Sequence, residues 1–459
     1  MRPVVTPVEM NAVDAAAPEP VEVLIGRAGG AVARAALAML GGAYGRRVVV
    51  IAGKGNNGND GREAARRLRA RGVRVTERAP GDTSAVPPCD LVIDAAFGTG
   101  FRGDYDAPEL APGTPVLAVD IPSGVDGLTG AAAGRVLTAD RTITFAAHKP
   151  GLLLHPGAEH AGTIEVADIG LDVSSASIHL VEPADVAAWY PPRSASGHKW
   201  QSAVWVVGGS PGLEGAAVLT SSAANRAGAG YVRWSSPGET PSLLKPTEVV
   251  GTELPPAGWA ADVLEDASRF AVVALGNGLG ISDAVVPDVQ QVVAGCPVPV
   301  IVDADAITAL ARDGRARDFT TETTILTPHE GEFARLAGHK PGADNGGDRI
   351  ADVRALAAHL GAIVLLKGPT TVVAGPDGRV LLSNTGDARL ATLGTGDVLS
   401  GVIAALVARG IPPFEAAAAG ACVHGLAGAL GWRDGLVAGD VVDLLPAVLE
   451  ELTSATAPS

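Results

Sequence analysis

Short apolar runs alternate with longer alanine-rich stretches along the whole chain. The runs are rich in valine and isoleucine and are followed by glycine, aspartate or serine, a pattern typical of strands that are buried on both faces of a sheet. The stretches between them carry apolar residues at helical spacing. Because strands that alternate with helices form parallel sheets with crossover helices, we predict that both halves of the chain are α/β.

The pattern divides into two series of strands and helices. In the first series we predict strands at 47–52, 90–95, 116–121 and 141–146, with helices at 31–40 and 62–71. In the second we predict strands at 203–207, 272–275, 298–302 and 363–366, with helices at 397–408, 415–430 and 441–452. A chain of 459 residues is too long for one ordinary core. The stretch 189–197 is predicted to be a linker or a loop, and we place the boundary slightly earlier, between residues 1–177 and 178–459.

Charge and cysteine content exclude several classes of protein. With 50 acidic and 35 basic residues the net charge is -15, which disfavours nucleic acid or anionic lipid as a partner. The cysteines Cys89, Cys296 and Cys422 are too widely separated for a disulfide framework or a Cys-x-x-Cys metal site. Residues 1–14 lack the pattern of a secretory signal, and 416–430 is too short and too glycine-rich for a spanning helix. We therefore expect a cytoplasmic protein that does not use a membrane.

Three polar segments follow predicted strands of the first series. The first is Gly53-Lys-Gly-Asn-Asn-Gly-Asn-Asp-Gly61, which leads into a helix, so free backbone N–H groups and the positive end of the helix dipole can bind an anion. The second runs from Asp94 to Asp104 and holds three glycines and Arg102, and the third is Asp120-Ile-Pro-Ser-Gly-Val-Asp126. Each strand-end carboxylate alone could be a helix cap. Because neighbouring strand ends meet at one sheet edge, we expect the three segments to form one cleft.

These motifs resemble the NAD(P)H-hydrate epimerase domain, and the resemblance covers residues 1–177. It implies a Rossmann-like three-layer αβα sandwich. It also implies that the hydrated dinucleotide is bound by two groups of residues, namely Asn56, Asn57, Gly58, Asn59, Asp60 and Gly98, Thr99, Gly100, Phe101, Arg102, Gly103, Asp104, with Asp120 facing the substrate. A potassium ion would be held by Asn57, Asp94 and Ser123. Asn59 replaces a glycine of the family pattern, and we expect it to be tolerated because asparagine accepts a positive φ.

The chemistry of the substrate suggests a role for Asp120. The carbon that carries the added hydroxyl lies next to a ring nitrogen, so loss of hydroxide gives a resonance-stabilised cation to which water can return on either face. A carboxylate near that hydroxyl can act first as a general acid and then as a general base. Our hypothesis is that Asp120 carries this proton.

The clearest motif of the second half is Leu393-Gly-Thr-Gly-Asp-Val-Leu-Ser-Gly401, a glycine turn that leads into an apolar helix. Its N–H groups can bind a phosphate, and Asp397 can take a proton from an attacking hydroxyl. The simpler alternative is that Thr395 and Asp397 only cap the helix. Upstream, Lys367-Gly-Pro-Thr-Thr371 ends a strand and offers a cation and hydroxyls, and His329 lies beside two carboxylates.

These pieces resemble the ribokinase-like superfamily and, within it, the ADP- or ATP-dependent NAD(P)H-hydrate dehydratases. The resemblance implies a ribokinase-like αβα domain with Asp397 as the base. Substrate contacts would come from Ala216, Gly278 and His329, together with Asp397. The adenine nucleotide would be bound by Lys367, Gly368, Pro369, Thr370, Thr371, Gly394, Thr395 and Gly396. Asp303 and Asp305 are either structural or arrange Mg²⁺ through water, and both alternatives stay open.

The two resemblances together imply repair of hydrated NADH and NADPH. The first domain would interconvert the R and S forms, and the second would phosphorylate the ring hydroxyl of the S form with ADP or ATP and then eliminate phosphate. Asn277 and Leu393 depart from the family pattern, where proline and glycine are usual. The alternatives are a ribokinase-like kinase of a small hydroxymethyl compound with an N-terminal nucleotide-binding module, and a binding protein without activity. We lean towards ADP as the nucleotide and expect a homo-oligomer.

Overall fold

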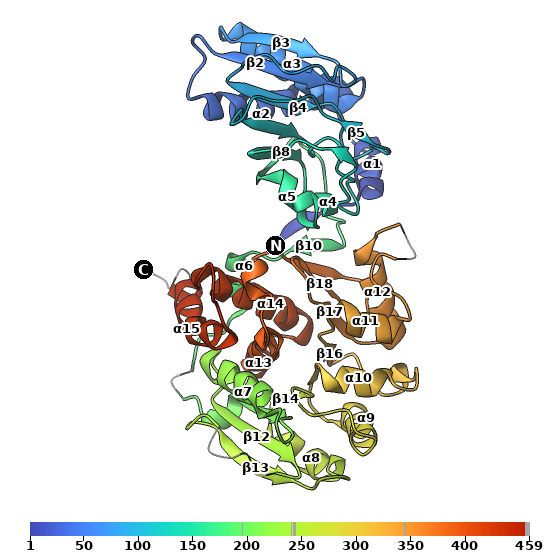
Figure 1. The fold of residues 1–459 in the computed structure, drawn as a ribbon, viewed down its shortest axis with the longest axis vertical. Helices are drawn as coiled ribbons and strands as arrows, with labels where there is room; N and C mark the ends of the chain where they lie inside the picture. The colour runs from blue at the N-terminus through green and yellow to red at the C-terminus, as the bar shows by residue number, and fades with distance from the viewer. Residues whose placement is uncertain (195, 240, 242–244, 344–345, 455–459) are drawn as a thin grey trace. The chain divides into compact units, whose positions relative to one another are not determined.

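The chain folds into two compact units, Arg2–Ile178 and His179–Ser459 (Figure 1). The computed structural model describes residues 1–194, 196–239, 241, 245–343 and 346–454. Each unit has its own sheet and its own hydrophobic core.

The first unit is built on a sheet of parallel strands in the order β3-β2-β4-β6-β8-β9. The strands are β2 (Arg47–Ala52), β3 (Arg74–Arg78), β4 (Leu91–Ala95), β6 (Val116–Val119), β8 (Arg141–Phe145) and β9 (Thr163–Ala167), with β1 (Arg2–Val4) and the short pair β5 (Tyr105–Asp106) and β7 (Gly134–Arg135) outside this sheet. Four of them, β2, β4, β6 and β8, lie within the four predicted strand ranges. Since β4 lies between β2 and β6, the segments after these three strands meet at one edge.

Two helices cover one face of this sheet, and their apolar sides bury the inward side chains of β2, β4 and β6. The helices of the unit are α1 (Pro7–Ala15), α2 (Val21–Leu40), α3 (Asn56–Ala70), α4 (Pro150–Leu153) and α5 (Gly157–Ala161). The opposite face packs against the segment that contains Tyr105 and Leu137. Both α2 and α3 begin earlier than predicted, because the glycines Gly26, Gly29 and Gly30 lie within α2 and the segment Asn56–Asn59 forms the first turn of α3.

The second unit contains a mixed sheet with its strands in the order β10-β19-β18-β17-β16-β15-β14-β11-β12-β13. Their bounds are β10 (Ile178–Leu180), β11 (Ala203–Val207), β12 (Tyr231–Pro237), β13 (Val250–Leu254), β14 (Val272–Leu275), β15 (Val300–Val302), β16 (Thr324–Leu326), β17 (Ile363–Leu366), β18 (Thr371–Ala374) and β19 (Val380–Ser383). Strand β18 runs antiparallel to both β17 and β19. The expectation of parallel strands throughout is therefore wrong at this end of the sheet, where short hairpins replace crossover helices.

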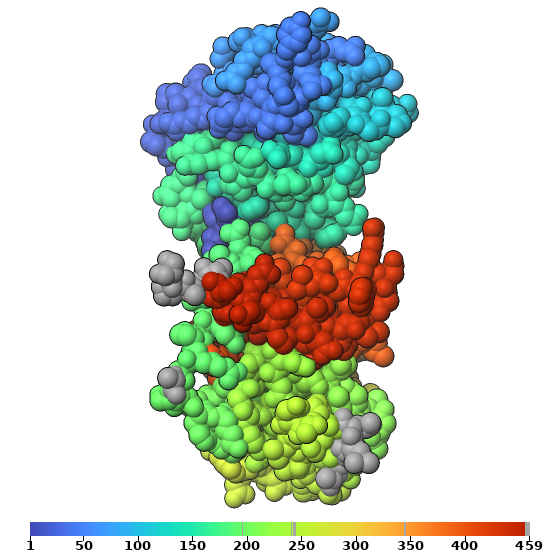
Figure 2. Space-filling view, turned by 90° about the vertical axis from the view of Figure 1, so that its left-hand side faces the viewer, coloured from blue at the N-terminus to red at the C-terminus, as the bar shows by residue number. Residues whose placement is uncertain are grey.

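Helices lie on both faces of this sheet, which makes three layers (Figure 1). The helices are α6 (Pro183–Trp189), α7 (Glu214–Arg226), α8 (Ala260–Asp266), α9 (Val285–Gly295), α10 (Asp305–Ala311), α11 (Glu330–Ala337), α12 (Arg349–Leu360), α13 (Thr395–Ala408), α14 (Pro413–Leu430) and α15 (Ala438–Ser454), with single 3-10 turns at Lys199–Ser202, Ala267–Arg269, Ala316–Asp318 and Ala388–Leu390. The red C-terminal helices lie against the green start of the same unit (Figure 2). A Cβ atom at Gly401 of α13 would overlap with the carbonyl oxygen of Thr220 on α7, so glycine permits this close packing.

Three other features bear on the sequence predictions. Among the described residues, α2 is the helix long and apolar enough to cross a membrane by length and composition, but half of its apolar window is buried inside the first unit, as in the core helix of a globular domain. The three cysteines are free. The predicted linker 189–197 begins at the last residue of α6, and its Ala195 lies outside the described residues.

Candidate functional site

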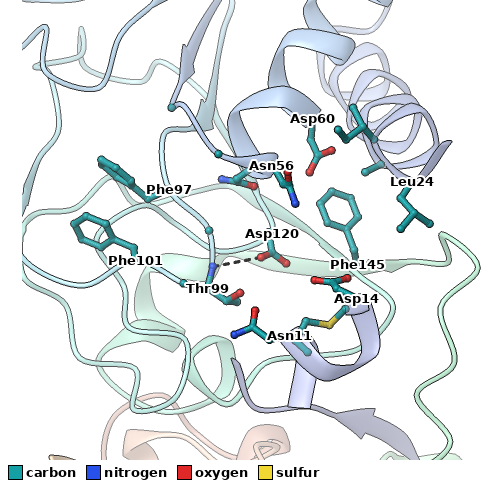
Figure 3. A pocket seen from close by; sticks show the side chains of 18 of the residues that line it. Asn11, Asp14, Leu24, Asn56, Asp60, Phe97, Thr99, Phe101, Asp120 and Phe145 are labelled. Carbon is teal, nitrogen blue, oxygen red and sulfur yellow. Dashed lines mark hydrogen bonds between the residues drawn. The ribbon is translucent and has the colours of Figure 1, made fainter. Parts of the chain in front are cut away.

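A cavity of about 1090 Å³ opens over the carboxyl ends of β2, β4 and β6 (Figure 3). It is lined by backbone and side chains from the segments that follow these strands and by residues of α1 and α2. The predicted residues that line it are Asn56, Asn57, Asp60, Gly98, Thr99, Gly100, Phe101, Arg102 and Asp120. Four other predicted residues are not part of its lining, namely Gly58, Asn59, Gly103 and Asp104. The three segments therefore form one cleft, as expected.

The glycine-rich turn after β2 is tighter than a loop, because α3 begins within it at Asn56. A Cβ atom at Gly58 would overlap with the carbonyl oxygen of Gly53, so this helix turn can lie against the strand end only with glycine there. Asn59 lies in the first turn of α3 and has no positive φ, which corrects our expectation for this residue. Its side-chain oxygen instead accepts a hydrogen bond of 3.0 Å from Arg62, which also donates to Gly53 O at 2.6 Å.

The three residues predicted to hold potassium lie deep beside this turn. Asp94 is fully buried, and Ser123 donates to its carboxylate through Oγ at 2.6 Å and through the backbone N–H at 2.9 Å. Burial raises the pKa of Asp94, while these hydrogen bonds from Ser123 act in the opposite direction. Both polar atoms of the Asn57 carboxamide are buried without a hydrogen-bond partner. An unpartnered buried amide oxygen is free to bind a cation.

Asp120 follows β6 with a φ of 66°, a conformation that is uncommon for a residue with a side chain. Its Oδ1 atom lies 2.8 Å from Nζ of Lys149 and accepts a hydrogen bond of 3.2 Å from the hydroxyl of Thr144. Lys149 is only 1% exposed, so this is a buried ion pair at the floor of the cavity. The strained backbone and the ion pair together fix the direction in which Asp120 points.

Asp60 of α3 and Asp14 of α1 also face the cavity (Figure 3). Burial, followed by the charges of Asp120 and Asp14, raises the pKa of Asp60 to about 8. Burial also raises the pKa of Asp14, again with a contribution from Asp120. Asp60 therefore carries a proton at neutral pH.

Sequence reasoning missed several residues of this cavity. Asn11 and Asp14 come from α1, which is remote in sequence, and no spacing pattern connects them with the strand ends. Lys149 could have been found, because it follows a predicted strand just as Lys367 does. Phe145, Leu24 and Ile25 form an apolar part of the wall that the polar motifs did not indicate.

In the second unit, Asp397 lies in the first turn of α13, directly after the glycine turn. The side-chain amide of Asn277 donates to Asp397 Oδ1 at 2.7 Å and to Asp303 Oδ2 at 3.0 Å. Asp303 also accepts hydrogen bonds from Lys367 Nζ at 2.9 Å and from Ser400 Oγ at 2.8 Å. One connected network therefore joins the predicted base to the predicted phosphate-binding lysine.

The network sets the protonation of its members. Burial raises the pKa of Asp397 to about 6, against the hydrogen bond from Asn277, which lowers it. The pKa of Asp303 is depressed despite its burial, because Lys367 and Ser400 stabilise the charged form. Burial opposes the charge of Lys367, but the neighbouring carboxylates Asp303 and Glu332 raise its pKa. Asp397 is thus a carboxylate at neutral pH that can still accept a proton.

The predicted nucleotide residues form two neighbouring turns. Residues 367–371 do not simply end a strand but connect the antiparallel strands β17 and β18. Lys367 Nζ lies 3.5 Å from the position that a Cβ atom would take at Gly396, so the ammonium is directly beside the glycine turn. The hydroxyl of Thr395 donates to Leu390 O and Thr392 O, both at 2.8 Å, and so stabilises the turn itself.

The predicted substrate residues of this unit lie at loop ends. Gly278 has a φ of 64°, and a Cβ atom there would lie 3.1 Å from the side chain of Ala216, so these two residues are neighbours. His329 is the N-cap of α11 and accepts a hydrogen bond from Gly331 N at 2.9 Å through Nδ1. Burial lowers the pKa of His329. Asp305 accepts a hydrogen bond from Gly280 N at 2.8 Å, so it fixes this loop.

Sequence comparison covers both units. A family profile described as NAD(P)H-hydrate dehydratase matches residues 204–446. A second profile, described as YjeF-related protein N-terminus, matches residues 21–82 and 76–151. The matched ranges contain the glycine turn before Asp397 in the second unit and the three polar segments in the first.

Whole-chain relatives have the same two-part organisation. The chain is 39% identical over 473 residues to the bifunctional NAD(P)H-hydrate repair enzyme Nnr of Moorella thermoacetica, covering 89% of this chain and 88% of the relative. It is 34% identical to the protein of that name from Escherichia coli, covering 88% of this chain and 85% of that relative. A ribokinase-like superfamily protein from Enterococcus faecalis superposes with a TM-score of 0.54 at 22% identity, covering 60% of this chain and 96% of that chain, which shows the fold of the second unit.

Proposed function

Since the chain belongs to the family of bifunctional NAD(P)H-hydrate repair enzymes, we propose that residues 1–177 carry the epimerase and residues 178–459 the ADP- or ATP-dependent dehydratase. The epimerase would interconvert the R and S forms of hydrated NADH and NADPH, and the dehydratase would return the S form to NADH or NADPH. Coupling the two activities in one chain would allow both forms to be repaired.

For the dehydratase, the observation that carries the proposal is the network of Asp397, Asn277, Asp303 and Lys367. Asp397 takes the proton of the ring hydroxyl, whose oxygen then attacks the terminal phosphate of the nucleotide. Lys367 and the N–H groups of residues 394–396 bind the transferred phosphoryl group. Phosphate is a better leaving group than hydroxide, so it departs with the electron pair of the carbon–oxygen bond, and loss of a proton from the neighbouring ring carbon then restores the ring double bond.

For the epimerase, Asp120 is the residue that moves the proton of the ring hydroxyl. Its position at the floor of the cavity and its ion pair with Lys149 support this role. The N–H groups at the start of α3 and Arg102 bind the phosphates of the dinucleotide. All the substrate residues named for this cavity stay a prediction, and four of them, Gly58, Asn59, Gly103 and Asp104, are not part of its lining.

Two metal ions fit the polar groups of the chain. The unpartnered oxygen of Asn57, beside Asp94 and Ser123, suits potassium, which would add positive charge near the dinucleotide phosphates. Mg²⁺ bound with the nucleotide would neutralise phosphate charge during transfer. Asp303 already accepts three hydrogen bonds from side chains, which favours a structural role for it over direct contact with Mg²⁺.

ADP is the preferred nucleotide, the enzyme is a homo-oligomer, and it works in the cytoplasm on free hydrated dinucleotide. Neither nucleic acid nor a membrane is a partner, which agrees with the net charge of -15.

The test is recovery of the nicotinamide absorbance of hydrated NADH with the purified full chain and Mg²⁺. Absorbance should return with ADP or ATP and not without nucleotide. A parallel reaction replaces the hydrate by a small hydroxymethyl compound such as a hydroxymethylpyrimidine. Phosphorylation of that compound, with no recovery of NADH, would favour the alternative of a small-molecule kinase.

A further inference from the structure

Three carboxyl groups and one ammonium group meet in the cavity of the first unit. Asp14 comes from α1, Asp60 from α3, Asp120 from the end of β6 and Lys149 from the segment after β8. The side chains of the three aspartates are directed into the same space (Figure 3). The function proposed above uses only Asp120, and it gives Asp60 no role beyond binding.

Lys149 is the buried counter-charge of Asp120. Besides Asp120 Oδ1 at 2.8 Å, its Nζ atom contacts Thr144 Oγ1 at 2.8 Å and the carbonyl oxygen of Phe145 at 2.9 Å, so each of its three N–H groups has an acceptor. A buried ammonium without a counter-charge is costly, and so is a buried carboxylate. The pair therefore stabilises Asp120 as a carboxylate, which is the form that a base needs.

Asp60 lies in the opposite environment. It is 7% exposed, and the charges that act on it are the carboxylates of Asp120 and Asp14. The ionisable groups that line the cavity around it are Asp14, Glu19, Lys54, Arg102, Asp120 and Lys149. Since burial and two like charges disfavour its ionised form, with a pKa of about 8, Asp60 carries a proton at neutral pH.

We propose that Asp60 is the general acid and Asp120 the general base of the epimerase, so that the two carboxyl groups form a proton relay across the cavity. The inference rests on the epimerase assignment of the first unit. Two carboxyl groups whose surroundings favour opposite protonation states are a recurring arrangement of acid and base in one site. Asp60 then contacts the reacting hydroxyl rather than only the dinucleotide.

The relay transfers one proton in each of its two steps. Asp60 gives its proton to the hydroxyl oxygen, the carbon–oxygen bond breaks with its electron pair leaving on water, and the ring nitrogen lone pair forms a carbon–nitrogen double bond. Water then adds to the other face of the ring carbon, the nitrogen regains its lone pair, and the proton that this water loses goes to Asp120. One water leaves and one enters, and nothing is oxidised or reduced.

At the end of this cycle Asp120 is protonated and Asp60 is ionised. That state is less stable than the starting one, because Lys149 faces a neutral Asp120 and Asp60 holds a buried charge. The proton therefore returns from Asp120 to Asp60 through cavity water, which resets the enzyme. In the reverse direction the same two groups exchange roles.

The test is a set of epimerase measurements on the full chain, starting from the separated R form and following the S form by chromatography. Asp60→Asn should lower kcat by about a hundredfold or more, with KM changed less than about threefold. The carboxamide matches a protonated carboxyl group in size and charge, so folding is expected to be retained and is checked by dehydratase activity on the S form. Asp106→Asn, an exposed carboxylate of β5 outside the cavity, is the matched control and should keep full activity.

A second readout separates acid catalysis from binding. In the unaltered chain kcat should fall about tenfold per pH unit above about 8, as Asp60 loses its proton. The variant Asp60→Glu should retain partial activity, and its kcat should also fall at alkaline pH. Full kcat in Asp60→Asn, or a loss confined to KM, would overturn the relay while leaving the proposed function intact. Absence of any epimerase activity in the unaltered chain would overturn both.

Discussion

The side-chain nitrogen of Asn277 lies 2.7 Å from Oδ1 of Asp397. Asn277 occupies a position where the family usually has proline, so this hydrogen bond is a feature of the present chain rather than of the motif. It connects Asp397 with Asp303 and, through Asp303, with Lys367. The residue that departs from the family pattern thus supplies a contact to the proposed base.

Asn277→Ala removes this contact and should lower dehydratase kcat about tenfold to a hundredfold, since a hydrogen bond to a charged group contributes roughly 1.5–3 kcal/mol. Loss of the hydrogen bond also raises the pKa of Asp397 further above 6, so the acid side of the rate profile should move to higher pH. The matched control is Gln291→Ala, which removes an exposed amide of α9. Equal rate profiles for the two variants would contradict the role given to Asn277.

Asp397→Asn should abolish dehydration and also stabilise the protein. The folded pKa of about 6 lies above the ordinary 3.8, so the stability that protonation gives is present below pH 3.8 and is lost as pH rises through 6. At neutral pH the charge costs up to about 3 kcal/mol. Removing the charge while keeping the hydrogen bond from Asn277 should raise the free energy of unfolding by about 1–3 kcal/mol in denaturant titration at pH 7.5, with little change at pH 4. A lower free energy of unfolding for the variant at pH 7.5 would contradict the conclusion that the buried charge of Asp397 destabilises the folded protein.

Below pH 6 the dehydratase rate should fall about tenfold per pH unit, because Asp397 must be ionised to accept a proton. Burial is the main cause of this shift, so the position of the fall should depend little on salt. The measurement is initial rate against pH at saturating hydrate and nucleotide. A rate that stays constant down to pH 4.5 would exclude Asp397 as the base.

Gly58→Ala should disrupt the epimerase domain selectively. The added Cβ atom overlaps with the carbonyl oxygen of Gly53, so α3 must move away from the end of β2. We expect loss of epimerase activity, destabilisation by about 1–3 kcal/mol and normal dehydratase activity. Gly26→Ala is the control, because the space around Gly26 in α2 is open and alanine favours a helix interior.

Potassium should be required by the epimerase alone. Exchange of potassium for tetramethylammonium should lower the epimerase rate and leave the dehydratase unchanged when Mg²⁺ is kept. The epimerase rate of Asn57→Ala should be low with either potassium or tetramethylammonium, because this variant lacks the unpartnered amide oxygen. Asn59→Ala should keep the dependence on potassium, since its side chain is bound by Arg62 instead.

The elements that the sequence predicted best are the central strands. Arg47–Ala52 and Ala203–Val207 match the prediction at both ends, because a strand buried on both faces is a nearly unbroken apolar run, here interrupted only by the exposed Arg47 at its start. The hairpin of β17 and β18 was missed, since the pattern of Lys367–Thr371 is equally typical of a strand end. Helix starts were placed too late wherever glycine and asparagine form the first turn, as at Asn56.

The site could be predicted only where its residues are adjacent in sequence. The segments around Asp60 and Asp120 follow strands, and strand ends are where α/β sheets bind ligands. The segment around Asp397 was predicted from its glycine turn at the start of a helix. The approach of Asp14 to Asp60 depends on the tertiary packing of α1, and no periodicity encodes it. Nor does the sequence reveal that Lys149 is buried against Asp120.

The assignment of the epimerase to the first unit and of the dehydratase to the second is tested most directly by mixing two inactive variants. Each of Asp120→Asn and Asp397→Asn is incubated alone with the R form of hydrated NADH, ADP and Mg²⁺, and then the two are combined. Neither variant alone should restore the nicotinamide absorbance beyond the spontaneous rate, and the mixture should, because the S form made by one variant diffuses to the other. Restoration by Asp397→Asn alone, or none in a mixture of two folded variants, would contradict the assignment of the two activities to the two units.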